Sequence, residues 1–468
     1  MTLLLEPDPT EVEEAPQQYS ALTPLMRWSL FAAVAIASLN VGYQAVSGGS
    51  FYVAIAPAAV LVGIGVAALA VVNFEAFILV LLVGRAVLDF SRGKVERSLG
   101  AATSSGPWAA AASAVLVIAG LLWLAGPRVR VRRSWQEITM AVFVATCTLS
   151  VVASDHPDRS LIEVARIMSA VVMFAVIRRL VIGAPEVADR VLAAVFASAL
   201  VPLAVAAFQM SAGSGGFTAG GYSRVRGTFV HPNPFALYLT LLIIMGVALW
   251  PHLQGWRQAA LAFVVAASGV ALIATYTRSG WLALFVALLV VGALQTRWLI
   301  PLLLCGALAI VAIVPSVSGR FSDLTETRNE RGAAENSLVW RYDYWKQAAD
   351  LGGRSPIIGI GLKMTQSATD EAKAPHNDVI RAYAETGVLG LAAYLAMVGA
   401  LIALALQALR NASPGRDRGI AVGFAACMVA FGLFSLVSNV ASQVVLLWYF
   451  FAFAAVASAI EPRVTPRR

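Results

Sequence analysis

The chain has 468 residues, of which 59% are hydrophobic and only 13% are charged. Soluble domains are about half apolar and about a quarter charged, so this composition excludes a large water-soluble enzyme domain. The formal net charge of +8 does not indicate a nucleic acid as partner, because Lys and Arg gather in the cytoplasmic loops of membrane proteins. The sequence also has no basic patch with interleaved aromatic residues.

Long apolar runs recur along almost the whole chain. Runs of about 17–25 residues are long enough to cross a bilayer, and continuous apolarity predicts helices rather than a β-barrel. We therefore expect an all-α polytopic membrane protein with about 12–14 transmembrane helices and one long extracytoplasmic loop. The fourteen candidate spans are 28–46, 51–72, 74–90, 108–126, 136–153, 160–182, 187–210, 233–250, 257–276, 280–295, 298–315, 379–409, 418–437 and 440–460.

The charges in the loops predict the orientation. With the N-terminus inside, sixteen arginines lie in the cytoplasmic segments, against seven Arg and Lys residues in the short outer loops. This bias predicts that both termini are cytoplasmic. The expected parts are an acidic tail (1–26), N-terminal transmembrane helices (27–210), helices that carry the arginine motifs (211–315), an extracytoplasmic loop (316–378), C-terminal helices (379–461) and a basic tail (462–468).

The long outer loop is polar and charged, but part of it has a helical pattern. Residues 336–351 predict a helix, with Trp340, Tyr344 and Trp345 as anchors at the membrane interface. The sequence Gly359-Ile360-Gly361 follows as a predicted turn.

Three short motifs fall on the predicted outer side. The first runs from Arg224 to Phe235, and we expect Asn233 to cap a helix that begins at Pro234. The second, Thr275 to Trp281, is a tight break between two spans. The third, Pro375 to Asp378, precedes a helix that we expect to run on through Arg381, Glu385 and Gly387.

Each motif opens a helix that runs inward from the outer side. The positive N-terminal ends of helices bind phosphate, and Arg226 and Arg278 can form bidentate contacts with phosphate oxygens. If the three helices are neighbours, the motifs form a cradle for a pyrophosphate at the membrane surface. His376 would lie beside it, kept neutral by the helix end and the arginines, and could accept a proton from a sugar hydroxyl.

Several other polar residues have two readings. His231 is either a competing base or a residue that shapes the turn into the next helix, and Arg224 is interpreted as a contact to lipid headgroups. The pairs Arg85 with Asp89, and Glu163 with Arg166, are either structural ion pairs or parts of a glycan cavity. Arg381 and Glu385, four residues apart, form either a helix salt bridge or a support for His376.

Four motifs in order resemble the O-antigen ligase and polymerase family. They are Arg-Gly-Thr-Phe-x-His-Pro-Asn-x-Phe-Ala (226–236), Thr-Arg-Ser-Gly (277–280), Trp-Arg…Trp…Ser-Pro-Ile-Ile-Gly-Ile-Gly (340–361) and His-Asn…Glu-x-Gly-x-x-Gly (376–390). The similarity covers about 220–395 strongly and the first 200 residues only in hydropathy.

The resemblance implies a GT-C-like, inverting, metal-independent glycosyltransferase in the inner (plasma) membrane of a bacterium, with no cofactor. It implies a glycan on undecaprenyl pyrophosphate as donor and a glycan or glycolipid as acceptor. By the resemblance His376 is the base, and Arg226 and Arg278 hold the diphosphate. We expect support from Arg341, Asn377, Arg381, Glu385, His231, Asn233, Arg85 and Arg166.

The motifs leave the exact activity open. A ligase would move the glycan to a different acceptor, whereas a polymerase would join repeat units on the lipid carrier, and both use the same donor chemistry. From another class, a transporter of an anionic solute would use the same arginines as a binding site. Against the transporter, the sequence has no matched pair of broken helices in two halves.

Overall fold

The computed structural model describes residues 63–88, 107–126, 133–213, 216–219, 222–313, 337–369 and 374–460. The chain divides into two compact units, Met1–Val80 and Leu81–Arg468. In the first unit, the apolar helix Gly63–Val72 is followed by Asn73, whose side-chain oxygen accepts a hydrogen bond from the backbone of Ala76. Asn73 therefore begins helix α3 (Phe74–Arg85), which crosses the boundary between the two units.

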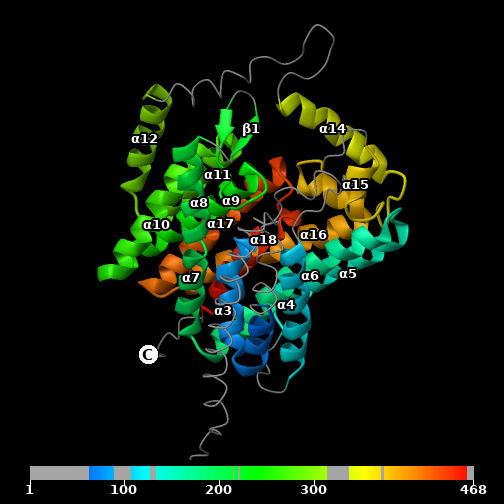
Figure 1. The fold of residues 1–468 in the computed structure, drawn as a ribbon, viewed down its shortest axis with the longest axis horizontal. Helices are drawn as coiled ribbons and strands as arrows, with labels where there is room; N and C mark the ends of the chain where they lie inside the picture. Colours follow the sequence, from blue (N-terminus) through cyan, green and yellow to red (C-terminus); the bar gives the residue numbers. More distant parts are fainter. Residues whose placement is uncertain are drawn as a thin grey trace, which may run out of the picture. The chain divides into compact units, whose positions relative to one another are not determined.

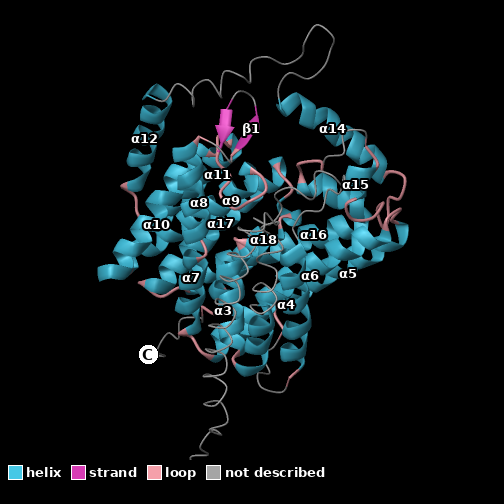
Figure 2. Cartoon of the chain, in the orientation of Figure 1, coloured by secondary structure: helices cyan, strands magenta, loops and turns pink. Residues whose placement is uncertain are grey.

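The described residues of the second unit are almost all helical (Figures 1 and 2). They also include a short antiparallel hairpin, β1 (Phe217–Ala219) with β2 (Tyr222–Arg224), in which Phe217 pairs with Arg224. The helices are α4 (Pro107–Ala125), α5 (Trp135–Ser150), α6 (Pro157–Gly183), α7 (Val187–Ala197), α8 (Leu200–Ala212), α9 (Pro232–Leu249), α10 (Gly255–Ala274), α11 (Arg278–Leu294), α12 (Leu299–Ile313), α14 (Ser337–Gly352), α15 (Met364–Ser367), α16 (Asp378–Asn411), α17 (Arg416–Val437) and α18 (Val444–Ala457), with 3-10 turns η4 (Val151–Ala153), η5 (Trp250–His252) and η6 (Val440–Ser442).

The prediction of an all-α polytopic membrane protein is confirmed. Within the described residues, seven helical segments are long and apolar enough to cross a membrane. The predicted span 28–46 lies outside the described residues, as does the first part of 51–72. The seven segments are Trp135–Ala153, Pro157–Gly183, Val187–Ala212, Pro232–His252, Gly255–Ala274, Asp378–Asn411 and Arg416–Val437, and the shorter apolar helices are Gly63–Val72, Ala109–Ala125, Arg278–Leu294 and Val444–Ala457.

Helix α18 forms the most buried part of the second unit. All of its residues from Val444 to Ala457 are buried, as expected for a helix that is apolar on every side. It packs against α6 and α17, and Phe450 stacks on Phe431 with ring centroids 4.5 Å apart. Next to it, α9, α11 and α17 pack against one another, and α16 packs against α5, α14 and α17 (Figure 1).

The helix predicted to continue from Asp378 is in fact broken. Gly387 has φ 66° and ψ −168°, which is not a helical conformation, and this region of backbone space is essentially restricted to glycine. The prediction of a continuous helix through Arg381, Glu385 and Gly387 was therefore wrong. Hydropathy did not reveal the break because the residues that follow Gly387 are as apolar as those of an ordinary span.

Candidate functional site

The loop that carries Arg226 is held in place by the side-chain amide of Gln209. The Oε1 atom of Gln209 accepts hydrogen bonds from the backbone N–H groups of Arg226 and Gly227, both at 3.0 Å. Its Nε2 donates to the carbonyl of Gly227, also at 3.0 Å. Gly227 has φ 56° and lies against the ring of Phe235, so a side chain would not fit there. Arg226 itself donates to the carbonyl of Val230 at 3.2 Å.

Arg224 joins the first motif to the second. Its Nε donates to the carbonyl of Thr275 at 2.8 Å, and its Nη2 donates to Asn233 at 2.9 Å and to the hydroxyl of Thr277 at 3.0 Å. With 8% of its surface exposed, Arg224 is a buried structural clamp. The interpretation as a headgroup contact was therefore wrong, because the guanidinium replaces its lost hydration with three fixed protein acceptors.

The cap of α9 also differs from the prediction. The helix begins at Pro232, and its N-cap is His231, whose Nδ1 accepts from the backbone N–H of Asn233 at 3.2 Å. The predicted cap, Asn233, lies inside the first turn and accepts from Arg224 instead. The imidazole of His231 thus fulfils the role that the sequence suggested for the amide.

Arg278 is the first residue of α11, directly after the break that Arg224 clamps. Arg341, on α14, lies near it. Burial lowers the pKa of Arg341, and the charge of Arg278 lowers it further. This electrostatic effect indicates that the two guanidinium groups, from distant parts of the chain, lie in one region. Two neighbouring cations are well suited to an anion that carries more than one negative charge.

Helix α14 confirms the predicted helix but corrects one of its expected anchors. Tyr344 is 1% exposed, and its hydroxyl is 2.6 Å from that of Thr369, so its ring is part of the protein interior. Trp345 donates from Nε1 to the carbonyl of Pro375 at 2.7 Å. The helix is thus tied to the residue that precedes His376.

His376 lies in a tightly constrained turn. Its φ is 55°, which is uncommon for a residue other than glycine. The next residue, Asn377, caps α16 by accepting from the N–H groups of Val379 and Ile380 and donates to the carbonyl of Leu436 at 3.2 Å. The backbone of His376 is therefore held next to a fixed cap.

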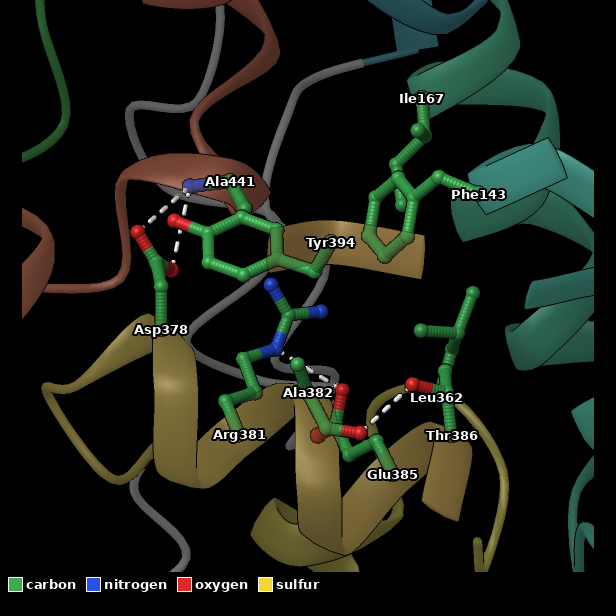
Figure 3. Close-up of a pocket in the computed structure, with 10 residues that line it drawn as sticks. All are labelled: Phe143, Ile167, Leu362, Asp378, Arg381, Ala382, Glu385, Thr386, Tyr394 and Ala441. Carbon is green, nitrogen blue, oxygen red and sulfur yellow. Dashed lines mark hydrogen bonds and ion pairs between the residues drawn. The ribbon is translucent and has the colours of Figure 1, made fainter. Parts of the chain in front are cut away.

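Asp378, which the sequence analysis did not single out, fastens the same turn to another helix. Its carboxylate accepts from the backbone N–H of Val440 at 3.0 Å and from that of Ala441 at 3.2 Å (Figure 3). Both residues belong to the 3-10 turn η6 between α17 and α18. The aspartate is 1% exposed. A carboxylate at the start of a helix gave no distinct signal, because Asp is common there for reasons of the helix dipole.

The sequence Pro356 to Gly361 docks backbone to backbone on the break in α16, and we call this contact the glycine joint. The N–H groups of Ile360 and Gly361 donate to the carbonyls of Ala384 and Glu385 at 3.1 and 3.0 Å. In return, Val388 and Leu389 donate to the carbonyls of Pro356 and Ile357 at 2.8 and 3.3 Å. An unbroken helix would pair these four backbone groups with each other, so the joint replaces the two helical hydrogen bonds that they would have made.

Two glycines permit this approach. Gly359 and Gly387 both have positive φ, and a Cβ at either position would collide with the opposite backbone. The Gly-Ile-Gly turn of the outer loop and the Glu-x-Gly segment of α16 are therefore two halves of one contact.

A buried charge network adjoins the glycine joint, with which it shares Glu385. Glu163 on α6 is 3.4 Å from Arg166, 3.3 Å from Arg381 and 3.8 Å from Lys363. Arg381 also donates to Glu385 at 2.8 Å (Figure 3). Glu385 accepts in addition from Thr365 at 2.6 Å. Both predicted pairs, Glu163 with Arg166 and Arg381 with Glu385, are thus present, but as parts of one network that joins α6, α16 and the loop before α15. The network residues are Glu163, Arg166, Lys363, Arg381 and Glu385.

Arg85, a further residue expected to support the site, packs against α18. Its guanidinium carbon lies 5.6 Å from the ring centroid of Trp448, and the side chain is 1% exposed. The predicted partner, Asp89, lies outside the described residues. A cation on an aromatic face in so dry a place contributes to packing as well as to charge.

His231 stands where the first and third motifs meet. Burial is the main reason that its pKa falls to about 4, and the charges of Arg224, His376 and Arg226 act in the same direction. Since Arg224 also holds the break that precedes Arg278, parts of all three motifs lie in one region of the second unit.

The middle of the chain matches a known family. Residues 261–395 match the family model described as O-Antigen ligase, which confirms the resemblance over that part of the chain. The match includes Arg278, Arg341, His376 and the glycine joint, whereas Arg226 and His231 precede it. A search of curated proteins finds no significant match.

Proposed function

We propose, starting from this match, that the protein is an O-antigen ligase-like glycosyltransferase of a bacterial inner membrane. The match supports a membrane glycosyltransferase-like role in polysaccharide biosynthesis. More specifically, we propose that it transfers a glycan from undecaprenyl pyrophosphate to an acceptor hydroxyl, without a metal and with inversion. Both termini would be cytoplasmic and the site would face outward.

The observation that supports this proposal best is the grouping of arginines around two histidines, His231 and His376. His231 experiences the charges of His376, Arg224 and Arg226, and Arg224 fixes the start of the helix that carries Arg278. The charge of Arg278, acting together with burial, lowers the pKa of Arg341, as expected if the two side chains lie near each other. A diphosphate held among these guanidinium groups would have its developing charge offset as it leaves.

In the proposed reaction, His376 removes the proton from the acceptor hydroxyl. The hydroxyl oxygen then attacks the anomeric carbon of the donor sugar, and the bond between that carbon and the pyrophosphate oxygen breaks. Undecaprenyl pyrophosphate leaves with the bonding electrons, and the proton stays on His376 until it passes to solvent. The fixed turn around His376 supports this role because a base works best at a constant distance from its substrate.

The test is transfer by the purified protein in proteoliposomes, with a lipid-linked glycan as donor and defined acceptors. We expect His376→Ala to lower the rate by about 10²–10⁴-fold, the usual contribution of a general base. The control is His156→Ala, because His156 is exposed at the N-cap of α6 and makes no side-chain cap hydrogen bond there. Wild-type rates in the His376 variant would refute the assigned role.

The products of the same assay separate the related activities. A new glycan on a different acceptor identifies a ligase, whereas a longer glycan on the lipid carrier identifies a polymerase. Solute flux into liposomes that contain no lipid-linked sugar would instead support a transporter.

A further inference from the structure

The turn between α17 and α18 lies against the start of α16. The side-chain amide of Asn377 donates to the carbonyl of Leu436 at 3.2 Å. The carboxylate of Asp378 accepts from the backbone N–H of Val440 at 3.0 Å, and that nitrogen belongs to the peptide bond that follows Asn439. These contacts hold Asn439 beside the start of α16, directly after the proposed base.

Asn439 occupies the N-cap of the 3-10 turn η6, but its side chain makes no cap hydrogen bond. Asn is among the residues preferred at an N-cap, where the side chain accepts from the second or third N–H of the helix. Here the second N–H, that of Ala441, is bonded to Asp378 at 3.2 Å. The third, that of Ser442, is bonded to the backbone carbonyl of Asn439 at 3.3 Å. Because these two groups are already satisfied, the turn does not need the amide of Asn439.

The amide of Asn439 is nevertheless buried. Only 5% of the residue is exposed, and its Oδ1 has no hydrogen-bond partner in the part of the chain that the structure describes. Burial of a polar group without a hydrogen bond destabilises a protein, and nearly all buried polar groups in native proteins have a partner. A bound molecule that donates a hydrogen bond would satisfy this oxygen.

The chemistry of the unpaired atom favours a sugar over a phosphate. Oδ1 is an acceptor, so its partner must donate a hydrogen bond. Sugar hydroxyls donate, whereas an ionised diphosphate only accepts and is better bound by guanidinium groups. In the proposed reaction the acceptor sugar gives its proton to His376, so that sugar must lie beside the start of α16.

We propose that Asn439 is a substrate-binding residue whose Oδ1 accepts a hydrogen bond from a hydroxyl group of the acceptor glycan. The inference rests on the proposed function and names the residue that would recognise the second substrate. It assigns a part in acceptor recognition to the turn 438–443, which lies outside the residues 261–395 that match the family model.

The variant Asn439→Leu separates a binding role from a structural one, because it has a similar size and no polar side-chain atom. Since it removes a buried polar atom without a partner, the melting temperature should stay the same or rise. The KM for the acceptor should rise about threefold to tenfold, as for one neutral hydrogen bond, while the KM for the lipid-linked donor stays unchanged. The matched control is Asn411→Leu at the other end of α16, which should leave both KM values unchanged.

The measurement is the proteoliposome transfer assay at saturating donor, with the acceptor glycan carried on a short alkyl chain. Wild-type KM values in Asn439→Leu would overturn the proposal. So would a rise in the KM for the donor alone, which would place the donor glycan at this turn, or a lower melting temperature without a change in the KM for the acceptor, which would make the amide structural. A wild-type protein that transfers no glycan from the lipid-linked donor to any acceptor would instead overturn the proposed function, so the two failures are distinguishable.

Discussion

The two sides of the candidate site treat their arginines differently. On the side of His376, the guanidinium of Arg381 is bound by the carboxylates of Glu163 and Glu385. On the other side, the described hydrogen bonds of Arg224 and Arg226 go to carbonyl, amide and hydroxyl oxygens. The first arrangement builds a support, because buried ion pairs join α6 and α16. The second fixes the loop before α9 and the break before α11 by hydrogen bonds.

The largest expected effect comes from removing charge on the supporting side. Glu163→Gln should destabilise the protein by about 3–5 kcal/mol, because Arg166, Lys363 and Arg381 lose a buried counter-charge. The measurement is the free energy of unfolding in mild detergent. The matched control is Asp189→Asn, whose pair with Arg416 is 2.5 Å long but exposed and should contribute about 0–1 kcal/mol. Equal effects would remove the distinction between the two kinds of pair.

The second prediction concerns the glycine joint. Gly387→Ala should cost at least about 1–3 kcal/mol, since it places a side chain at φ 66° and into the backbone of Ile357. It should also lower transfer, because the joint holds the helix that begins beside His376. Gly399→Ala in the same helix is the control: no atom would lie within 4 Å of its Cβ, and the change should stabilise by about 0.5–1 kcal/mol. Thermal melting of both variants compares them.

The third prediction tests the arginine side. Arg224→Lys keeps the charge but cannot reproduce the fork that reaches Thr275, Asn233 and Thr277 together. We expect a loss of about 1–2 kcal/mol in stability and weaker binding of the diphosphate, because the start of α11 is no longer fixed. Binding that stays at the wild-type level would show that Arg278 is positioned without this clamp.

The smallest effect is a pH dependence. The pKa of His231 falls to about 4 on folding, against about 6.5 in an unfolded chain. Between these values the unfolded state binds more protons, so stability contributed by the neutral ring is complete above about pH 6.5 and decreases as the pH falls towards 4. His231→Asn should reduce the acid-induced drop in melting temperature by roughly 1–2 °C. An identical drop in both proteins would contradict the low pKa.

The sequence predicted the helical class well because each apolar run must satisfy its own backbone in lipid. It did not predict the break at Gly387, whose hydrogen bonds are replaced by Pro356 to Gly361. That replacement depends on a contact between segments that are separate in sequence, and hydropathy contains no information about it.

The sequence indicated candidate site residues where polar residues interrupt apolar runs. Arg226, Arg278 and His376 stood out for that reason, and the pair of Glu163 with Arg166 followed from helical spacing. The partners Lys363 and Arg381 did not, since each reaches Glu163 from about 200 residues along the chain. Arg224 was misinterpreted because nothing in its neighbours indicates that three acceptors from two other segments surround it.

The glycine joint has a consequence for how this chain can change. Its four hydrogen bonds are made by main-chain atoms alone, so they depend on the two glycines and on little else in the side chains nearby. The other side chains of Pro356 to Gly361 can therefore change without loss of these four hydrogen bonds, provided that Gly359 and Gly387 are kept.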